Sequence, residues 1–149
     1  IMKWRIKHYE NIKKDTLYDI LKERVDVFVV EQECPYPEID GKDKDSYHLW
    51  AEENDEIVAY TRLIPRGISY EEASIGRVLV KMDYRGKGLG RKLMEKSIDY
   101  MEESMEENEI RISAQERLHD FYVSLGFEQV SEMYLEDGIP HIEMYYNNN

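Results

Sequence analysis

The feature that most constrains the fold is a glycine-rich turn between a buried strand and the longest helix of the chain. A run of aliphatic and β-branched residues predicts the strand over 74–80. Apolar residues at helical spacing predict the helix over about 88–107. Between them, Gly86, Gly88 and Gly90 leave backbone N–H groups accessible, because glycine has no Cβ. A helix N-terminus combines unpaired N–H groups with the positive end of the helix dipole, so this turn predicts an anion site.

The charges around the turn indicate that the anion is a polyphosphate. Four cations lie within eight residues that contain no acid, in a chain whose net charge is −12: Arg85, Lys87, Arg91 and Lys92. The helix carries glutamates near its far end, which is the reverse of what the dipole favours. Neither the Walker spacing nor the Rossmann spacing of glycines is present. The pattern therefore predicts a nucleotide-type polyphosphate outside those two motifs.

The order of the predicted elements indicates an α+β fold in a single domain over residues 1–149. Strands are expected at about 3–9, 48–53, 57–64, 74–80, 110–114, 127–135 and 141–146, and helices at about 15–30, 88–107 and 116–125. Asp15 or Thr16 would cap the first helix, Gly126 would follow the last, and Asn54-Asp55 would turn a hairpin. A central sheet with helices on both faces is the economical way to bury this set.

The composition argues against several classes of function. An excess of 32 acidic over 20 basic residues disfavours nucleic acid, whose phosphates need a basic surface. No apolar run approaches the length of a membrane span, and the four histidines lack metal-binding spacing. Cys34 is the only cysteine, so a disulfide within the chain is excluded. We expect a cytoplasmic monomer or homodimer without a metal, a nucleic-acid partner or a membrane partner.

Three segments resemble those of a known superfamily, the GCN5-related N-acetyltransferases (GNAT). Arg85-Gly86-Lys87-Gly88-Leu89-Gly90 resembles the motif R/Q-x-x-G-x-G/A, and residues 115–127 are similar to N-x-x-A-x-x-F-Y-x-x-x-G-F. The segment 24–36, with Asp40-Gly41 and His48, resembles the ElaA-type subgroup. The resemblance implies a central, mostly antiparallel, twisted sheet of about seven strands with about four flanking helices. Its fourth and fifth strands would splay apart.

The resemblance also implies acetyl-CoA as the acyl donor. Its pyrophosphate would bind the amides of Arg85, Gly86, Lys87, Gly88, Leu89, Gly90 and Arg91. Its pantetheine arm would pair with the backbone of Val78, Leu79 and Val80. Gln115 and Tyr122 complete the implied cofactor-binding set, with Gln115 in the usual asparagine position and Leu118 in place of a common alanine.

The implied reaction is direct attack of an amine on the acetyl thioester. A backbone N–H near Leu79 is the implied oxyanion donor, and Tyr122 is the implied general acid for the leaving thiolate. Ser74 stands where some members carry a glutamate base. The base therefore stays open between a water relay and four side chains, namely His48, Glu31, Glu33 and Asp40.

The acceptor is expected to be an amine of a small molecule or a peptide. It would contact the segment around Cys34-Pro35-Tyr36-Pro37, with five candidate residues: Glu31, Glu33, Tyr36, Asp40 and His48. Cys34 itself is expected to be a spectator thiol. Two alternatives remain at this point. One is a non-catalytic acyl-CoA sensor or interaction module, and the other is a transferase for longer acyl chains or an oxygen acceptor.

Overall fold

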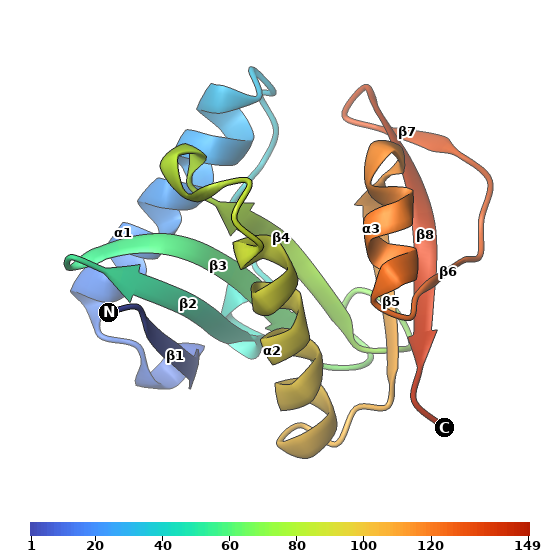
Figure 1. The fold of residues 1–149 in the computed structure, drawn as a ribbon, viewed down its shortest axis with the longest axis horizontal. Helices are drawn as coiled ribbons and strands as arrows, with labels where there is room; N and C mark the ends of the chain where they lie inside the picture. Colours follow the sequence, from blue (N-terminus) through green and yellow to red (C-terminus); the bar gives the residue numbers. More distant parts are fainter.

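The chain forms two four-stranded sheets, as the computed structural model of residues 1–149 shows (Figure 1). The first sheet has the order β1-β2-β3-β4, and the second has the order β5-β8-β6 with β7 also paired to β8. All of these strand pairs are antiparallel. The strands are β1 (Lys3–His8), β2 (Tyr47–Glu53), β3 (Glu56–Ile64), β4 (Ser74–Val80), β5 (Glu109–Gln115), β6 (Glu128–Gln129), β7 (Tyr134–Glu136) and β8 (Ile139–Asn147). The α+β class with a mostly antiparallel sheet is confirmed, with eight strands where about seven were expected.

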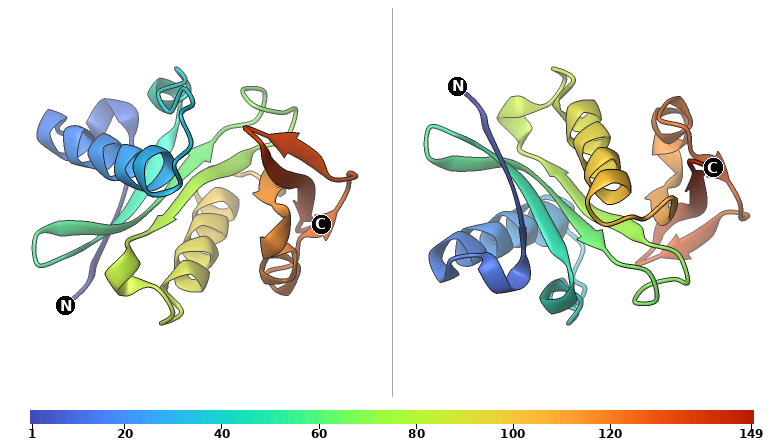
Figure 2. Two further views of the ribbon diagram at one scale, coloured as in Figure 1. Left: turned by 90° about the horizontal axis from the view of Figure 1, so that it is seen from above. Right: turned by 90° about the horizontal axis from the view of Figure 1, so that it is seen from below.

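The three α-helices are α1 (Lys14–Val25), α2 (Leu89–Glu103) and α3 (His119–Ser124). Figure 2 shows α1 and α2 on opposite faces of the first sheet, with α3 beside α2 on the second. The buried face of α2 includes Leu93, Met94 and Met101, which belong to the larger apolar cluster of the molecule. On the other face, Ile20 of α1 packs in a smaller cluster with Tyr60 of β3. The methionines of α2 are therefore core packing residues. None of the helices combines the length and the apolar composition needed to cross a membrane.

The fourth and fifth strands separate, as expected. One isolated parallel bridge, between Ala73 and Ile110, joins the two sheets at the base of β4 and β5. The Arg111 N–H donates to the Ala73 carbonyl there at 2.9 Å. Beyond this point β4 pairs only with β3 and β5 pairs only with β8, so the facing edges of β4 and β5 diverge (Figure 1).

The first helical segment differs from the prediction in its cap and in its last two turns. Lys13 is the N-cap of α1 and makes no side-chain cap bond, so neither Asp15 nor Thr16 has that role. The α-helix ends at Val25, and residues Asp26–Glu31 continue as a π-helix. π-Helical turns are rare and occur often at functional sites. Here the wider turn carries Phe28 and Glu31 toward the junction of the two sheets.

Helix α2 ends at Glu103, four residues before the predicted end near Glu107. The Glu107 N–H bonds back to the Met101 carbonyl at 2.8 Å, and Glu106 between them has a left-handed φ of 56°. This bond spans one residue more than that of a Schellman motif, and a glutamate here takes the left-handed conformation that glycine adopts more readily. The buried carboxylate of Glu107 also pairs with Arg66, Nε to Oε1 at 2.7 Å, which holds the chain away from the helix axis.

The C-terminal third also departs from the predicted boundaries. The short helix predicted over 116–125 begins as a 3-10 turn, Glu116–Leu118, before α3. The long strand predicted over 127–135 is divided into β6 and β7 by an irregular segment. Gly126 follows the end of α3 with φ of 101°, which confirms its predicted position after the helix. Asn54 and Asp55, both at positive φ, form the predicted hairpin turn between β2 and β3.

Candidate active site

A cleft of about 400 Å³ lies where the two sheets separate. One wall is the edge of β4, and the other is formed by β5, α3 and the start of β8. Phe28 of the π-helix, together with Cys34 and Tyr36 of the following segment, lines the same cleft. The cleft therefore brings together the β4 strand, the Tyr122 helix and the predicted acceptor segment.

The β4 edge is shaped by a bulge at Arg77. Tyr60 pairs with Leu79 and Arg62 pairs with Gly76, so two residues of β4 stand opposite one residue of β3. Arg77 has a left-handed φ of 52°, an uncommon conformation for a residue with a Cβ. The bulge increases the local twist of β4 at the place where its outer edge has no strand partner.

The direction of the β4 amides corrects one prediction. The Lys81 N–H donates to the Val58 carbonyl of β3 at 2.9 Å. Because alternate residues of a strand direct their N–H groups to opposite edges, the Leu79 N–H also points toward β3. Val78 and Val80 point the other way, and the Val80 carbonyl indeed accepts a bond from Arg85 Nε at 2.7 Å. Leu79 is thus not the donor that its position in the sequence implied.

The glycine-rich turn has the backbone geometry of an anion site. Gly86 and Gly88 have φ of 78° and 80°, values that residues with a Cβ rarely adopt. Gly88 is the N-cap of α2, no side chain caps the helix, and its first turn contains no acid. The first N–H with a helical acceptor is that of Lys92, bonded to the Gly88 carbonyl at 3.2 Å, so the amides of residues 86–91 are available to a ligand. The Arg85 N–H, which was also expected to bind phosphate, instead donates to the Met82 carbonyl at 3.2 Å.

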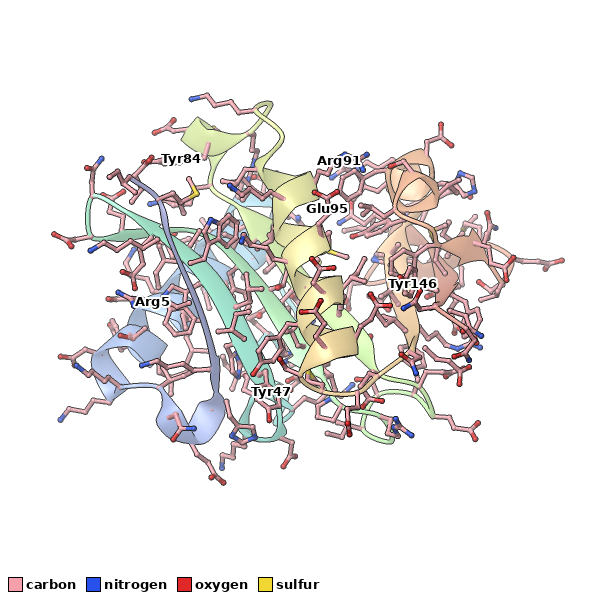
Figure 3. The ribbon with its side chains drawn as sticks, turned by 60° about the horizontal axis from the view of Figure 1, so that its bottom comes forward. Arg5, Tyr47, Tyr84, Arg91, Glu95 and Tyr146 are labelled. Carbon is pink, nitrogen blue, oxygen red and sulfur yellow. The ribbon has the colours of Figure 1, made fainter.

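The arginines of this turn are held in defined positions. Arg85 forms a two-pronged ion pair with Glu31 of the π-helix, at 2.7 and 3.1 Å. Glu31 therefore contacts the phosphate side of the site. Arg91 lies on the side of α2 that faces α3 (Figure 3), donates to Ser124 Oγ at 2.6 Å and covers the Phe121 ring.

Tyr122 of α3 faces the cleft from the second wall. Its ring packs edge-on between those of Phe121 and Phe127, with centroids at 5.2 and 5.7 Å. Its hydroxyl makes no hydrogen bond within the protein and is not among the fully enclosed polar atoms, so it is open to a ligand in the cleft. Burial, only partly offset by Arg117, raises the pKa of Tyr122 to about 12. Gln115 also lines the cleft, and its Oε1 accepts from Arg117 Nε at 3.0 Å.

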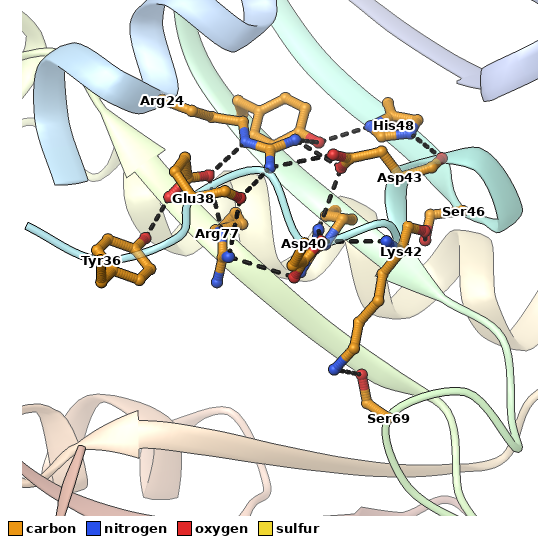
Figure 4. Close-up of polar contacts among 12 residues, drawn as sticks. Arg24, Tyr36, Glu38, Asp40, Lys42, Asp43, Ser46, His48, Ser69 and Arg77 are labelled. Atoms are coloured by element: carbon orange, nitrogen blue, oxygen red, sulfur yellow. Dashed lines mark hydrogen bonds and ion pairs between the residues drawn. The ribbon is translucent and has the colours of Figure 1, made fainter. Parts of the chain in front are cut away.

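A buried ion-pair network fixes the segment between the π-helix and β2 (Figure 4). Arg24, with no exposed surface, bonds to Glu38 at 2.7 Å and to Asp43 at 2.6 Å. Arg77 also bonds to Glu38, at 2.8 Å, and so ties the β4 bulge to the same carboxylate. The Tyr36 hydroxyl donates to the other oxygen of Glu38, and the Tyr36 ring lies under the Arg77 guanidinium.

His48, the first candidate base, belongs to this network and does not line the cleft. Its Nε2–H donates to the Asp43 carbonyl at 3.0 Å, so its Nδ1 accepts from the Tyr60 hydroxyl at 2.5 Å. The residue is completely buried, and burial lowers the pKa of His48 despite the bond to Asp43. With both ring nitrogens engaged inside the protein, His48 has no path to an acceptor in the cleft.

Of the other predicted acceptor residues, Asp40 and Glu33 do not line the cleft, whereas Tyr36 does. Asp40 accepts two hydrogen bonds from Arg62, both at 2.8 Å. Partial burial alone would raise the pKa of the Asp40 carboxyl, but the bonds from Arg62 outweigh burial and hold this pKa well below its ordinary range. Glu33 is exposed, at a left-handed φ of 51°, and does not line the cleft. Tyr36 is the one predicted acceptor residue that does, beside Cys34.

The second wall carries polar residues that the sequence did not single out. Ser113 of β5, Glu136 of β7 and His141 of β8 all line the cleft. Glu136 and His141 lie five residues apart on the β7–β8 hairpin, whereas Ser113 is 23 residues before Glu136. The three residues belong to no recognisable motif, and the pairing of β5 with β8 is what brings Ser113 beside the hairpin.

Taken together, the diverging edges of β4 and β5, the bulge and the glycine turn before α2 define an acyltransferase fold. The chain belongs to the GNAT acetyltransferase family, because the family model for the acetyltransferase (GNAT) domain matches residues 16–147. Within that family it is an ElaA-type member and an N-acetyltransferase. It is 40% identical over 146 residues to protein ElaA of Escherichia coli (strain K12), covering 97% of this chain and 95% of that one.

The solved structures agree. An acyl-CoA N-acyltransferase from Pseudomonas aeruginosa has a TM-score of 0.94 at 40% identity, covering 98% of this chain and 99% of that one. The structure of Escherichia coli ElaA has a TM-score of 0.91 at 39% identity, with 99% and 100% covered. Among protein sequences, a UPF0039 protein of Schizosaccharomyces pombe (strain 972) is also similar, with 42% identity over 140 residues that cover 93% of this chain and 92% of that one.

Proposed function

We propose that this protein transfers an acetyl group from acetyl-CoA to a primary amine of a small molecule or peptide, by direct attack on the thioester. The observation that carries the proposal is that one cleft joins three features. These are the open N-terminus of α2, the free bulged edge of β4 and the unpaired Tyr122 hydroxyl. The similarity to an acyl-CoA N-acyltransferase supports the same class of donor.

The residues present fit such a donor. Acetyl-CoA would supply an activated acyl group as a thioester, and its phosphates match the free amides that precede Lys92, with Arg85 and Arg91 beside them. The outward amides of Val78 and Val80 would pair with the pantetheine arm, as a strand pairs with a sheet edge. One of these two N–H groups, in place of that of Leu79, would donate to the carbonyl oxygen as charge develops on it.

Tyr122 would supply the proton that the leaving thiolate takes up. A phenol whose pKa is raised to about 12 stays protonated throughout the physiological range. Its hydroxyl is held by packing of its ring and has no competing partner in the protein. General acids of this kind contribute about 10²–10⁴ in rate.

The proposal is tested in two stages. Calorimetry should show one acetyl-CoA site per chain that is weakened by Gly88→Asp, with dephospho-CoA and ATP as comparison ligands. Thiol release from acetyl-CoA should then be measured with tyramine, spermidine and an α-amino-blocked lysine ester. Absence of acetyl-CoA binding would refute the donor. Binding without thiol release to any amine or alcohol would favour a non-catalytic sensor, and release with alcohols alone would refute the amine acceptor.

A further inference from the structure

The second wall of the cleft contains a histidine–carboxylate pair, His141 and Glu136, and each of the two side chains is oriented by a further hydrogen bond. His141 stands at the start of β8, its side chain is 10% exposed, and it lines the cleft. Its Nε2 lies 3.4 Å from Glu136 Oε2. Asp137 lies in the turn that joins β7 to β8, and its backbone carbonyl is 3.9 Å from the Cys34 sulfur across the cleft.

The state of the His141 ring follows from its other nitrogen. Nδ1 is 2.8 Å from the Ile139 carbonyl, which can only accept, so Nδ1 carries a proton and donates. In the neutral ring the lone pair is therefore on Nε2, which is the atom beside Glu136. The Tyr134 ring is stacked beside the imidazole, with an interplanar angle of 28° and 6.3 Å between centroids.

The Glu136 carboxylate is oriented by a hydrogen-bond chain. The Ser113 hydroxyl donates to Glu136 Oε1 at 3.0 Å. Since that proton is used, the Tyr134 hydroxyl must be the donor in its 2.5 Å contact with Ser113 Oγ. Oε2 is thereby left facing His141, so a carboxylate oxygen and an imidazole lone pair converge on one point without a donor between them.

A protonated primary amine satisfies both acceptors at that point. Resting on the function proposed above, we propose that Glu136 and His141 form the acceptor-ammonium subsite and that His141 is the general base. Glu136 accepts one N–H of the ammonium group, while Nε2 accepts the proton that has to leave. The subsite selects unhindered primary amines, because an ammonium without N–H groups offers neither bond.

The step balances without any further reactant. His141 Nε2 takes one proton from R–NH₃⁺, which gives R–NH₂ and an imidazolium beside the Glu136 carboxylate. The amine lone pair forms the C–N bond, and the C–S bond breaks with its electron pair on sulfur. Tyr122 protonates the thiolate and is itself reprotonated by the proton that nitrogen releases. The products are the amide, free CoA and one proton, which His141 returns to water.

The first wall offers no competing base. Glu38 and Asp40 are paired with arginines, and Arg77 faces the cleft with its guanidinium engaged by both. Tyr134 and Glu136 of β7 lie beside His141 on its own wall. The other titratable groups that line the cleft are Asp137 from the turn, Tyr122 from α3, Cys34 and Tyr36 from the acceptor segment, Arg77 from β4 and Arg85 from the glycine-rich turn.

The test compares pH profiles of kcat/KM for His141→Gln and for a matched control, His119→Gln. His119 is also a histidine beside a carboxylate, with Nδ1 2.9 Å from Asp120, but it does not line the cleft. The kcat/KM of wild type and of His119→Gln should rise with pH and then level off once the base is deprotonated. His141→Gln should lose about 10²–10⁴ in kcat/KM and should rise about tenfold per pH unit without levelling, because only free amine then reacts.

Binding is measured separately, so that loss of folding cannot be mistaken for loss of a base. Glu136 is 49% exposed at its side chain, so Glu136→Gln should fold normally. With ¹⁵N-histidine-labelled protein, methylammonium should shift the His141 ring nitrogens, tetramethylammonium should not, and Glu136→Gln should weaken the response at least tenfold. Equal responses to both cations, or a His141→Gln profile that still levels off, would overturn the subsite. Failure of wild type to release CoA with any amine would instead count against the proposed function, and the methylammonium titration would still decide the subsite.

Discussion

Replacing Arg24 with methionine tests how much the buried ion-pair network stabilises the fold around the segment between the π-helix and β2. Three arginines (Arg24, Arg62 and Arg77) are balanced there by three carboxylates (Glu38, Asp40 and Asp43). Removal of Arg24, which has no exposed surface, leaves one uncompensated negative charge in the interior. Breaking a buried pair in this way costs about 3–5 kcal/mol. In the variant, Glu38 is still paired with Arg77 and Asp43 with Arg62. The cost should therefore lie at the lower end of this range, and we expect a loss of about 3 kcal/mol in the free energy of unfolding.

The assay is urea unfolding at neutral pH followed by circular dichroism, with thermal unfolding as a second measure. For a chain of this size each kcal/mol shifts Tm by about 2–4 °C, so Tm should fall by about 6–12 °C. Lys22→Met is the matched control, because Lys22 lies on the same helix and pairs with Asp26 at 2.9 Å on the surface. That pair is exposed to solvent, so its loss should change the free energy of unfolding far less than the loss of Arg24. If Arg24→Met lost less than about 1 kcal/mol, the network would not be stabilising the fold around this segment.

The same network makes a prediction about acid. The arginine bonds, which outweigh the opposing effect of burial, lower the pKa values of Asp40 and Asp43 in the folded state. Their contribution to stability is therefore present above the ordinary carboxyl pKa of about 3.9, and it is lost as the pH falls through the lower folded values. Because Arg24 bonds to Asp43 and not to Asp40, Arg24→Met removes only the part of this contribution that belongs to Asp43. The difference in unfolding free energy between wild type and Arg24→Met should therefore narrow below about pH 4. A difference that stays constant down to acid unfolding would contradict this linkage.

Three further outcomes are expected. Tyr122→Phe should lower kcat by about 10²–10⁴ and leave the acetyl-CoA affinity measured by calorimetry unchanged. Because the pKa of Tyr122 is raised to about 12, the kcat of wild type should show no fall from ionisation of the phenol below about pH 10. Gly88→Ala should cost about 1–2 kcal/mol of stability in urea, because its φ of 80° is left-handed while a Cβ there would meet no atom within 4 Å. Glu31→Gln should tighten acetyl-CoA binding in the same titration, because it removes the carboxylate that holds Arg85; weaker binding would mean that Glu31 orients Arg85 for the phosphates.

Local signals in the sequence predicted the parts of the fold that local physics determines. The glycine turn before α2, the Asn54-Asp55 hairpin and Gly126 after α3 each depend on a few adjacent residues with special backbone preferences. The end of α2 could not be predicted in this way, because glutamate at position 106 adopts the left-handed conformation and a distant arginine, Arg66, pairs with Glu107. The π-helix after α1 likewise has no signature in the order of its residues.

The site was predictable only where a motif carries it. The glycine turn and Tyr122 belong to segments with recognisable spacing, and the structure brings both to one cleft. The direction of the Leu79 N–H was not predictable, because it depends on the pairing of β4 with β3 beyond the bulge at Arg77. His48 was a candidate because of its titration range, but the Tyr60 hydroxyl and the Asp43 carbonyl, from two other elements, bond to its two ring nitrogens inside the protein.

The distribution of charge between the two walls explains why the sequence left the base open. Of the acids expected near the acceptor, Glu31 and Asp40 are bound to arginine and Glu33 does not line the cleft. Glu38 and Asp43, which the sequence did not single out, are bound to arginine as well, so none of these arginine-bound carboxylates is available to take a proton. A wall whose charges are neutralised internally is rigid, and it adds little field to the cleft. Proton transfer therefore has to come from the opposite wall, where Glu136 and His141 face each other with both acceptor sites open. Strand pairing assembles that wall from residues 113 to 141, so its chemistry appears only in the folded chain.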